Sequence, residues 1–340
     1  AYVMEWGRYF APRALYRLQE AGIHPRLMTE AFEAEIGGQP RAFERGAIVI
    51  PVHQWEVPSD TVHAVVRRIV ERDHVEVYAL RTGLSRSGPD LGSRGSEVLP
   101  KPKIALVTGS GGGSRYGGAS AYNAGEVWHL LSERFEIPVT LLDMSDVERA
   151  DLSRYNTMVL AGGSYDALPA EKVERWVREG GRLIALQNAV AWPVEHELVE
   201  LEKKEIDLDS LVQDLPYDRL SDGYGAHEIG GSIFEAELDA THPLAYGYDE
   251  AVPVFRVGND FYAPSKRPGA SVATYSEAMP RLSGYVSEEM MEQARGSASI
   301  EAHRVGQGRV VLFMDNPNFR AFWWGTNGFF LNAVFFGGAF

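Results

Sequence analysis

One stretch constrains this 340-residue chain more than any other: a short apolar run, then a long glycine-rich loop, then a helix. Residues 104–107 read Ile-Ala-Leu-Val, which is typical of a parallel strand buried on both faces. The glycine-rich residues 109–118 follow. Asn123 is then the predicted helix N-cap, with Glu126 three residues further on as in a capping box. Because open α/β sheets bind ligands at the carboxyl ends of their parallel strands, we predict a ligand-binding crevice here.

The glycines of this loop do not form a nucleotide-binding motif. Ser114 stands where the third glycine of G-x-G-x-x-G would be, and the Gly-Lys-Ser/Thr ending of a phosphate loop is missing. A nucleotide ligand is therefore not expected. A loop that binds another ligand and a loop that binds nothing are both compatible with the sequence.

The composition excludes several classes of protein. The formal net charge of −14, without a basic stripe, argues against a nucleic-acid partner, whose phosphates require a basic surface. The absence of cysteine excludes a disulfide framework, a thiolate metal site and a cysteine nucleophile. No apolar run approaches the roughly 20 residues that a membrane-spanning helix needs, so the apolar residues 329–336 are expected to form a buried helix. No pattern indicates an oligomeric state.

The order of predicted strands and helices divides the chain into two parts. Residues 1–80 alternate strands and helices in a βαβ-type pattern, which predicts a small parallel sheet. Residues 83–103 are rich in Gly, Ser and Pro and are the predicted linker. We therefore predict a small α/β subdomain at 1–98 and a larger α/β domain at 99–340, with a β-rich insertion around 226–305.

The larger part resembles the class I glutamine amidotransferase-like fold, a flavodoxin-like parallel α/β sheet. After the first strand and helix, apolar strands are predicted at 139–142, 157–161 and 183–186, separated by a helix and by Gly-Gly pairs. In that fold the strand corresponding to 183–186 leads into a sharp turn that carries a cysteine nucleophile. The sequence here continues Gln187-Asn-Ala-Val. The resemblance therefore implies the fold without amidotransferase chemistry.

Longer motifs resemble the C-terminal, non-catalytic region of bacterial zinc carboxypeptidase-like metallopeptidases. They are Ala11-Pro-Arg-Ala-Leu-Tyr-Arg-Leu, Tyr122-Asn-Ala-Gly-Glu-Val-Trp, Trp176-Val-Arg-Glu-Gly-Gly-Arg-Leu-Ile-Ala and Asp315-Asn-Pro-Asn-Phe-Arg-Ala-Phe-Trp-Trp-Gly-Thr. The resemblance implies a parent hydrolase, active in proteolysis, with a zinc peptidase domain upstream. Since the chain lacks an initiator Met and opens in a predicted strand, we expect it to be a fragment of that longer protein. A secreted or periplasmic localisation follows from the resemblance alone.

Zinc is implied only for the upstream peptidase domain, and no cofactor is predicted for this fragment. The family binds its metal through a His-x-x-Glu pair and a distant His, which leave one position open for a water. His53 and Glu56 match that pair, but no later His stands in a matching context. No metal site is therefore predicted. His242, in a predicted turn before Pro243, is expected to be exposed to solvent.

We predict a ligand-binding crevice built from glycines, amides and charged side chains at the strand ends, with no catalytic residue. Its predicted residues are Gly111, Gly112, Gly113, Arg115, Tyr122, Glu126, Gly162, Gly163, Ser164, Asn188, Asp315, Asn316 and Arg320. Glu126 is either a helix cap or a ligand-facing carboxylate. Asp315 and Arg320 are either a structural clamp or a catalytic pair. Trp323 and Trp324 either stack on a ligand or seal a domain contact.

Three functions are compatible with these observations. The first, our leading interpretation, is an accessory, non-catalytic domain that packs on the peptidase domain or binds a peptide or cell-wall ligand. The second is a cysteine-free hydrolase with Glu126 or Asp315 as general base. The third is a free-standing small-ligand or carbohydrate-binding module.

Overall fold

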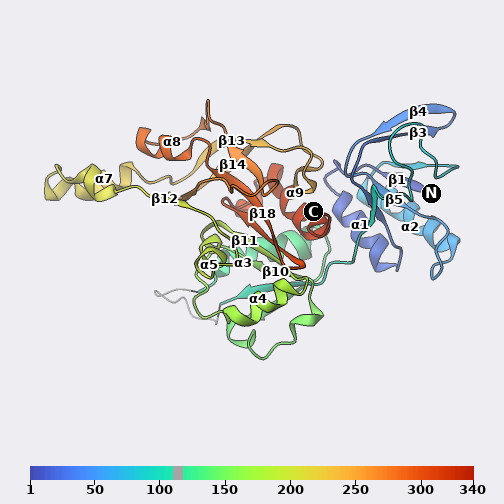
Figure 1. Cartoon of the computed structure of the whole chain (residues 1–340), viewed down its shortest axis with the longest axis horizontal. Helices are drawn as coiled ribbons and strands as arrows, with labels where there is room; N and C mark the ends of the chain where they lie inside the picture. The colour runs from blue at the N-terminus through green and yellow to red at the C-terminus, as the bar shows by residue number, and fades with distance from the viewer. Residues whose placement is uncertain (110–117) are drawn as a thin grey trace.

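The computed structural model describes residues 1–109 and 118–340, and it contains two main β-sheets with helices packed on them (Figure 1). Gly111, Gly112, Gly113 and Arg115 of the predicted crevice lie outside the described residues. The first sheet has the strand order β6-β1-β5-β2-β7. Its strands are β1 (Tyr2–Met4), β2 (Arg26–Met28), β5 (Ile48–Ile50), β6 (Val77–Ala79) and β7 (Ser96–Val98). The helices of this part are α1 (Ala11–Glu20) and α2 (Ser59–Asp73). The strands β3 (Phe32–Ile36) and β4 (Gln39–Phe43) form a separate hairpin.

The prediction that the first sheet is parallel is wrong, because each strand in it pairs antiparallel with its neighbours. The βαβ pattern itself is real: β1-α1-β2 and β5-α2-β6 each join two strands that run in the same direction. However, β5 lies between β1 and β2, and β1 lies between β5 and β6. The two units are therefore split βαβ units that interleave, as in ferredoxin-like folds. Sequence periodicity indicates the crossover but not the strand inserted into it.

The second sheet begins with five parallel strands in the order β9-β8-β10-β11-β19. They are β8 (Ile104–Thr108), β9 (Val139–Asp143), β10 (Thr157–Leu160), β11 (Arg182–Leu186) and β19 (Gly308–Phe313). In chain order this is 2-1-3-4-5, the flavodoxin-like arrangement. The predicted parallel α/β fold class of the larger part is thus confirmed. In such a sheet, ligands bind where the carboxyl ends of the strands meet.

Antiparallel strands continue this sheet beyond β19 in the order β18-β16-β13-β14. They are β13 (Ser232–Leu238), β14 (Ala251–Arg256), β16 (Ser271–Tyr275) and β18 (Ala298–Val305), with β17 (Arg281–Ser283) beside β13 and the small ladder β12 (Lys203–Lys204) with β15 (Phe261–Tyr262) nearby. These strands extend the parallel sheet instead of forming a separate one. They bring β14 and β15 toward the ligand-binding edge. The boundaries at residues 98, 226 and 305 stay predictions.

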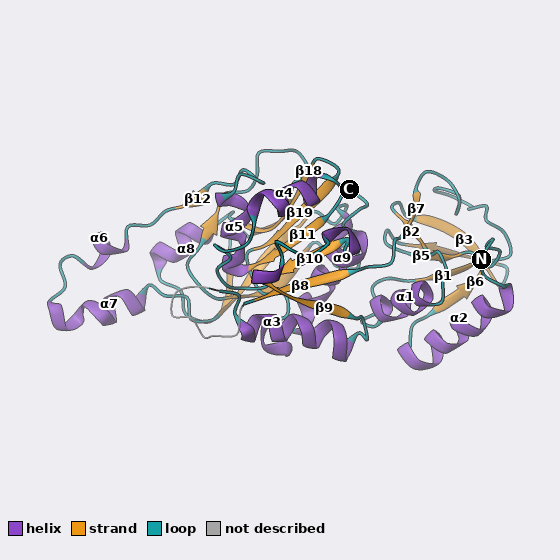
Figure 2. Ribbon diagram, turned by 90° about the horizontal axis from the view of Figure 1, so that it is seen from below, coloured by secondary structure: helices purple, strands orange, loops and turns teal. Residues whose placement is uncertain are grey.

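Helices cover both faces of the second sheet (Figure 2). One face packs on α3 (Ala121–Trp128), which continues as the π-helix η1 (His129–Arg134), and on α9 (Asn327–Phe336). The other face packs on α4 (Ala170–Arg178) and α5 (Ala191–Glu195). The N-cap of α3 is Ser120, whose hydroxyl accepts a hydrogen bond from the Asn123 backbone, so the predicted cap at Asn123 is wrong. The Asn123 side chain is thereby left for another role.

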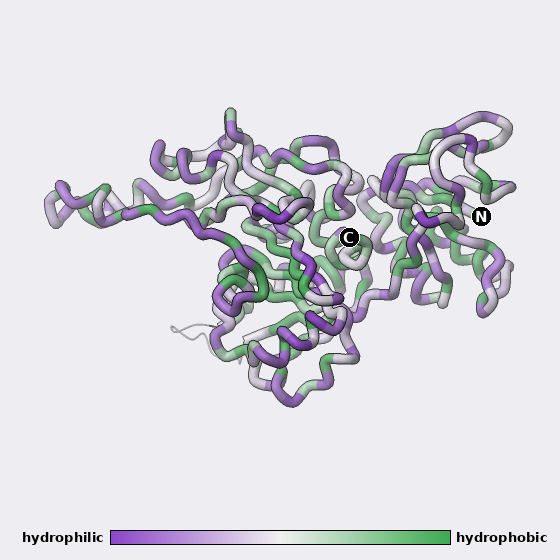
Figure 3. The backbone as a smooth tube through the Cα atoms, viewed as in Figure 1, coloured by the Kyte–Doolittle hydropathy of each residue, from purple (hydrophilic) through white to green (hydrophobic). Residues whose placement is uncertain are grey.

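Helix α9 joins the two parts of the chain. Its apolar side chains surround it on all sides, and all its residues except Gly328 are buried, as expected for a helix packed from every direction. One continuous apolar core contains residues of α9, of α1 and of the strands β8 and β19. Figure 3 shows hydrophobic residues along these central elements, whereas the projecting arm with α6 (Leu208–Val212) and α7 (Leu220–Ala226) is largely hydrophilic. Among the described residues, no helix has the length and apolar character needed to cross a membrane.

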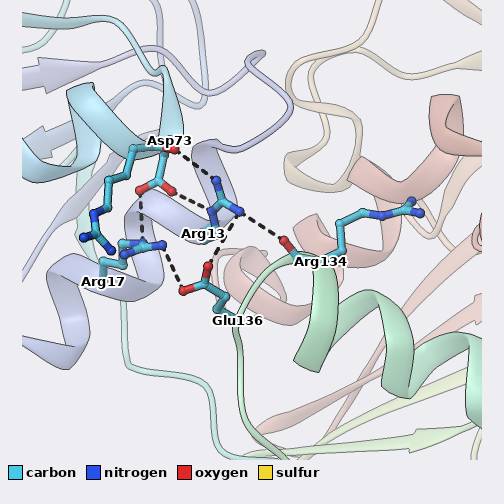
Figure 4. A network of polar contacts seen from close by, with 6 residues as sticks. Arg13, Arg17, Asp73, Arg134 and Glu136 are labelled. Atoms are coloured by element: carbon cyan, nitrogen blue, oxygen red, sulfur yellow. Dashed lines mark hydrogen bonds and ion pairs between the residues drawn. The ribbon is translucent and has the colours of Figure 1, made fainter.

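An ion-pair cluster also links the two parts (Figure 4). Asp73, at the end of α2, has a fully buried side chain and pairs with Arg13 at 2.6 Å and Arg17 at 3.1 Å, both from α1. Arg17 also pairs with Glu136, just after η1, at 2.9 Å, and Arg13 donates to the Arg134 carbonyl. The first sheet is thereby tied to the helix that covers the second.

His242 is buried, so the prediction that it is exposed is wrong. Its ring Nδ1 accepts a hydrogen bond from the Leu244 backbone and caps the short helix η6 (Pro243–Ala245). Burial lowers the pKa of His242 to about 4, against an opposing effect of Asp239. The imidazole therefore stays neutral in the fold at pH values where it is protonated in the unfolded chain.

This burial predicts a loss of stability in acid. Because the unfolded-state pKa is about 6.5, the unfolded chain binds more protons than the fold between about pH 6.5 and pH 4, so the free energy of unfolding decreases as the pH falls through that window. His242 accounts for about 3 kcal/mol of that loss. In His242→Asn the amide oxygen can still accept the hydrogen bond from Leu244. We expect the free energy of unfolding of this variant, measured in urea, to fall by about 3 kcal/mol less between pH 7 and pH 4 than that of the unaltered chain. An equal fall in both proteins would contradict the proposed role of His242 in acid sensitivity.

Candidate functional site

A cavity of about 230 Å³ opens at the carboxyl ends of the parallel strands. We call it the strand-end cavity. Its lining residues are Asn123, Gln187, Asn188, Arg256, Val257, Gly258, Asp260, Tyr262 and Met314. One wall comes from α3 and the ends of β11 and β19, and the opposite wall comes from residues after β14 and from β15. This is the edge at which the crevice is predicted, now closed on its far side by the antiparallel extension.

Gln187 occupies a strained turn at the end of β11. The strand passes directly into the short helix η4 (Gln187–Val190), and Gln187 itself has φ 53°, in the left-handed region that a side chain with Cβ rarely adopts. This geometry is that of a nucleophile elbow, a sharp strand-to-helix turn that exposes one side chain at the end of the sheet. Here the exposed group is a carboxamide. A carboxamide donates and accepts hydrogen bonds but cannot act as a nucleophile.

Gly162, at the end of β10, lets the amides beside the elbow come together. An added Cβ at Gly162 would lie 2.2 Å from Asn123 Nδ2 and 2.7 Å from Gln187 Oε1. Those two side chains meet directly above the glycine, where Asn123 Nδ2 donates to Gln187 Oε1 at 3.3 Å. The bond orients the Gln187 amide so that its nitrogen is available, since Nε2 has no hydrogen-bond partner among residues 1–109 and 118–340.

Asn188 and Gly163 form the next contact along the edge. The Gly163 backbone N–H donates to Asn188 Oδ1 at 2.9 Å, which fixes this carboxamide with its nitrogen pointing away from the glycine. Gly163 has φ 156°, and an added Cβ would lie 2.7 Å from the Gly118 carbonyl, so only glycine fits there. The Gly163 N–H is thus bonded within the protein.

A buried charged network lies beneath the opposite wall. Arg256, at the end of β14, is 2% exposed and donates to the carbonyls of Met314 and Gly258 and to Asp315 Oδ1. Asp315, directly after β19, accepts at 2.7 Å from the Tyr275 hydroxyl. Burial raises the pKa of the Asp315 carboxyl, and the Arg256 guanidinium opposes this. The network holds the ends of the two sheet segments together and leaves the Arg256 charge compensated.

Glu126 is a clamp and not a free carboxylate. Its Oε1 accepts from the Arg320 backbone at 2.7 Å and its Oε2 accepts from Asn316 Nδ2 at 2.5 Å, so both oxygens are used. Burial raises the pKa of Glu126, and these two bonds oppose the shift. Arg320 and Ala321 have φ of 49° and 55°, so Glu126 holds a strained turn after β19. Neither Glu126 nor Asp315 lines the strand-end cavity, so this cavity gives no support to the hypothesis of a hydrolase with either carboxylate as general base.

The remaining predicted residues have local roles. Ser164 donates to Asp166, and Tyr122 is exposed on α3 outside the cavity lining. Trp324 stacks on Tyr9 at 5.6 Å and thus contributes to the contact between the two parts of the chain. Among the predicted residues that the structure describes, only Asn188 lines the cavity.

The other eight residues that line the cavity were not predicted as site residues from the sequence, and those with polar side chains are Asn123, Gln187, Arg256, Asp260 and Tyr262. Two of them have a signal in the sequence. Gln187 stands at the position where the amidotransferase resemblance places a nucleophile. Arg256 interrupts an otherwise apolar strand, and a charge in such a run is buried only with partners. Asp260 pairs with Lys203 at 2.6 Å across the small ladder, a contact that no spacing in the sequence indicates.

No group of three His, Cys, Asp or Glu side chains among the described residues is placed to hold a metal ion. His53 lies 3.4 Å from Ser59, in the loop before α2, and Glu56 is exposed beside it. No step is therefore assigned to a metal in this chain.

No protein-family model and no curated protein matches the sequence. Solved structures do show a similar arrangement. A ThuA-like protein of Parabacteroides merdae is 14% identical, with a TM-score of 0.42 over 69% of this chain and 89% of that one. A second ThuA-like protein, from Bacteroides uniformis, is 12% identical (TM-score 0.43; 68% and 89%), and PurLQS from Thermotoga maritima is 12% identical (TM-score 0.43; 68% and 97%). These likenesses concern the fold alone, and nothing among them shows a zinc carboxypeptidase parent.

Proposed function

We propose that this chain is a non-catalytic accessory domain that binds a small neutral ligand in the strand-end cavity. One observation carries the proposal: the side chain presented by the strained elbow is the Gln187 carboxamide, with the carboxamides of Asn123 and Asn188 beside it. Strain of this kind costs of order 1 kcal/mol or more and clusters at active sites and ligand clamps. Because the side chain at this elbow is a carboxamide and not a nucleophile, its role is to bind a ligand through hydrogen bonds.

The charges around the cavity favour a neutral ligand. The Arg256 guanidinium is buried and paired with Asp315, and Asp260 is paired with Lys203, so each charged group already has a counter-charge. The groups left for a ligand are the amide nitrogens of Gln187 and Asn188 and the Tyr262 phenol. Such groups recognise hydroxyl and amide functions, as in a sugar or a peptide unit.

The carboxypeptidase resemblance extends this proposal to a partner. In that reading an upstream zinc metallocarboxypeptidase domain of the same polypeptide carries the catalysis and the zinc, and this domain packs on it and binds part of a peptide or cell-wall substrate. Support for that parent comes from the motifs at Ala11, Tyr122, Trp176 and Asp315. The free-standing carbohydrate-binding module is the alternative for the same cavity.

Calorimetric titration tests the binding role with two neutral probes, N-acetylglucosamine and N-acetylalaninamide. We expect saturable binding of at least one probe to the unaltered chain and binding about tenfold weaker to Gln187→Met, which keeps the length of the side chain but removes its hydrogen bonds. The matched control is Gln213→Met, because Gln213 is exposed directly after α6 and does not line the cavity.

Two outcomes would sink the proposal. One is equal affinity of the unaltered chain and Gln187→Met for every probe that binds. The other is hydrolysis of a bound probe, detected by mass spectrometry after incubation, since the carboxamide at the elbow cannot act as a nucleophile.

A further inference from the structure

A second cavity lies between the segment that joins β1 to α1 and helix α9. Its volume is about 190 Å³, and four segments that are distant in the sequence meet around it. We call it the aromatic cavity, because its walls include Trp6, Tyr9, Phe135, Tyr246, Tyr248 and Trp324. Gly7, Gly247, Gly325 and Gly328 also line it. None of its residues belongs to the strand-end cavity.

The polar atoms of these aromatic side chains are turned toward the protein. The pairs are Trp6 with Asn332, Tyr9 with Asn327, Tyr246 with the Thr29 carbonyl and Trp324 with the Ala321 carbonyl, at 2.6, 2.9, 3.0 and 3.1 Å. The Tyr248 hydroxyl is buried against the backbone of α9. The aromatic walls therefore present mainly ring and hydrocarbon surface to an occupant.

This lining selects against a hydroxylated ligand. A buried hydroxyl without a hydrogen-bond partner costs about 1 to 3 kcal/mol, so a sugar would lose several such contacts on entering. An apolar ring loses none and gains the burial of its surface. Arg8, at the rim, is paired with Glu76, so it offers no uncompensated charge.

The volume of the cavity limits the size of the ligand. A dry apolar cavity of about 150 Å³ accommodates a benzene molecule. About 190 Å³ therefore corresponds to one compact ring system and not to an extended chain. We propose that the aromatic cavity is a second binding site, which takes a compact neutral aromatic molecule of the size of indole. An occupant there touches both parts of the chain and binds only while they are packed together.

A filling variant tests the proposal. An added Cβ at Gly7 would have no neighbour closer than the Gly247 atoms at 3.9 Å, so Gly7→Leu can place its side chain in the cavity without a backbone clash. Gly83→Leu is the matched control, because Gly83 lies in an exposed loop with nothing within 4 Å of an added Cβ. The probe is indole, titrated by calorimetry, with glucose as the polar comparison.

We expect saturable indole binding to the unaltered chain and to Gly83→Leu, and at least tenfold weaker indole binding to Gly7→Leu. Glucose is expected not to bind in the aromatic cavity, so Gly7→Leu should not change any glucose signal. Should Gly7→Leu not fold by circular dichroism, Gly325→Leu replaces it, since Gly325 also lines the cavity and has open space at Cβ. Absence of saturable indole binding, or equal binding to a folded filling variant, would overturn the proposal. So would glucose binding that the filling variant removes.

Discussion

Replacing Arg256 by methionine is expected to lower the free energy of unfolding by about 3 to 5 kcal/mol, because it removes one partner of a buried ion pair. The guanidinium, 2% exposed, joins Asp315 and the carbonyls of Met314 and Gly258 across the end of the sheet. Methionine fills the space but leaves the carbonyls unsatisfied and the Asp315 carboxyl without its counter-charge. Urea unfolding followed by circular dichroism measures the loss.

Arg149→Met is the control for that measurement. Arg149 pairs with Asp146 on the surface, where its side chain is 81% exposed, and a pair of this kind contributes at most about 1 kcal/mol. Equal losses in Arg256→Met and Arg149→Met would contradict the network described beneath the cavity wall.

Asp73→Asn is expected to lower the free energy of unfolding by about 3 kcal/mol, the second largest of the expected effects. The fully buried Asp73 carboxylate neutralises Arg13 and Arg17 together, and both guanidinium groups remain in place when the charge is removed (Figure 4). The two arginines are 15% and 13% exposed, so water offsets part of the penalty and the loss lies at the low end for a buried pair. The measurement is again urea unfolding.

The arrangement in Figure 4 also predicts which region of the chain is destabilised when Asp73 is replaced. Since Arg17 bridges Asp73 to Glu136, we expect faster proteolytic cleavage between the two sheets, at residues 99–103, in Asp73→Asn. Asp146→Asn, which removes an exposed partner, serves as the control and should change neither stability nor cleavage by more than a small amount. Unchanged cleavage in Asp73→Asn would show that the cluster does not hold the two parts together.

The parallel half of the fold could be predicted because its signals are local. The strands β8, β10 and β11 are largely apolar runs, and glycines follow β8 and β10. The first sheet could not be predicted in the same way, because the insertion of β5 between β1 and β2 is a long-range pairing. Helix α9 was predictable as a buried helix from its uniformly apolar residues.

The site was harder to predict, since its residues act through contacts that cross the chain. The Glu126 carboxylate has the same sequence context whether it caps a helix, faces a ligand or, as in the structure, clamps Asn316 and the Arg320 backbone about 190 residues away. Asn123, assigned to a cap, instead bonds to Gln187. The amidotransferase resemblance pointed to the turn after β11, but only the φ of Gln187 shows that the elbow keeps its strain without a nucleophile.

The central claim is that the strand-end cavity binds a neutral ligand through the elbow carboxamides, and a crystal structure of the chain soaked with N-acetylglucosamine or N-acetylalaninamide tests it most directly. We expect an intact probe between Gln187 and Tyr262, with a ligand oxygen accepting a hydrogen bond from the amide nitrogen of Gln187 or Asn188. A cavity without either probe, or a probe cleaved in it, would contradict this claim.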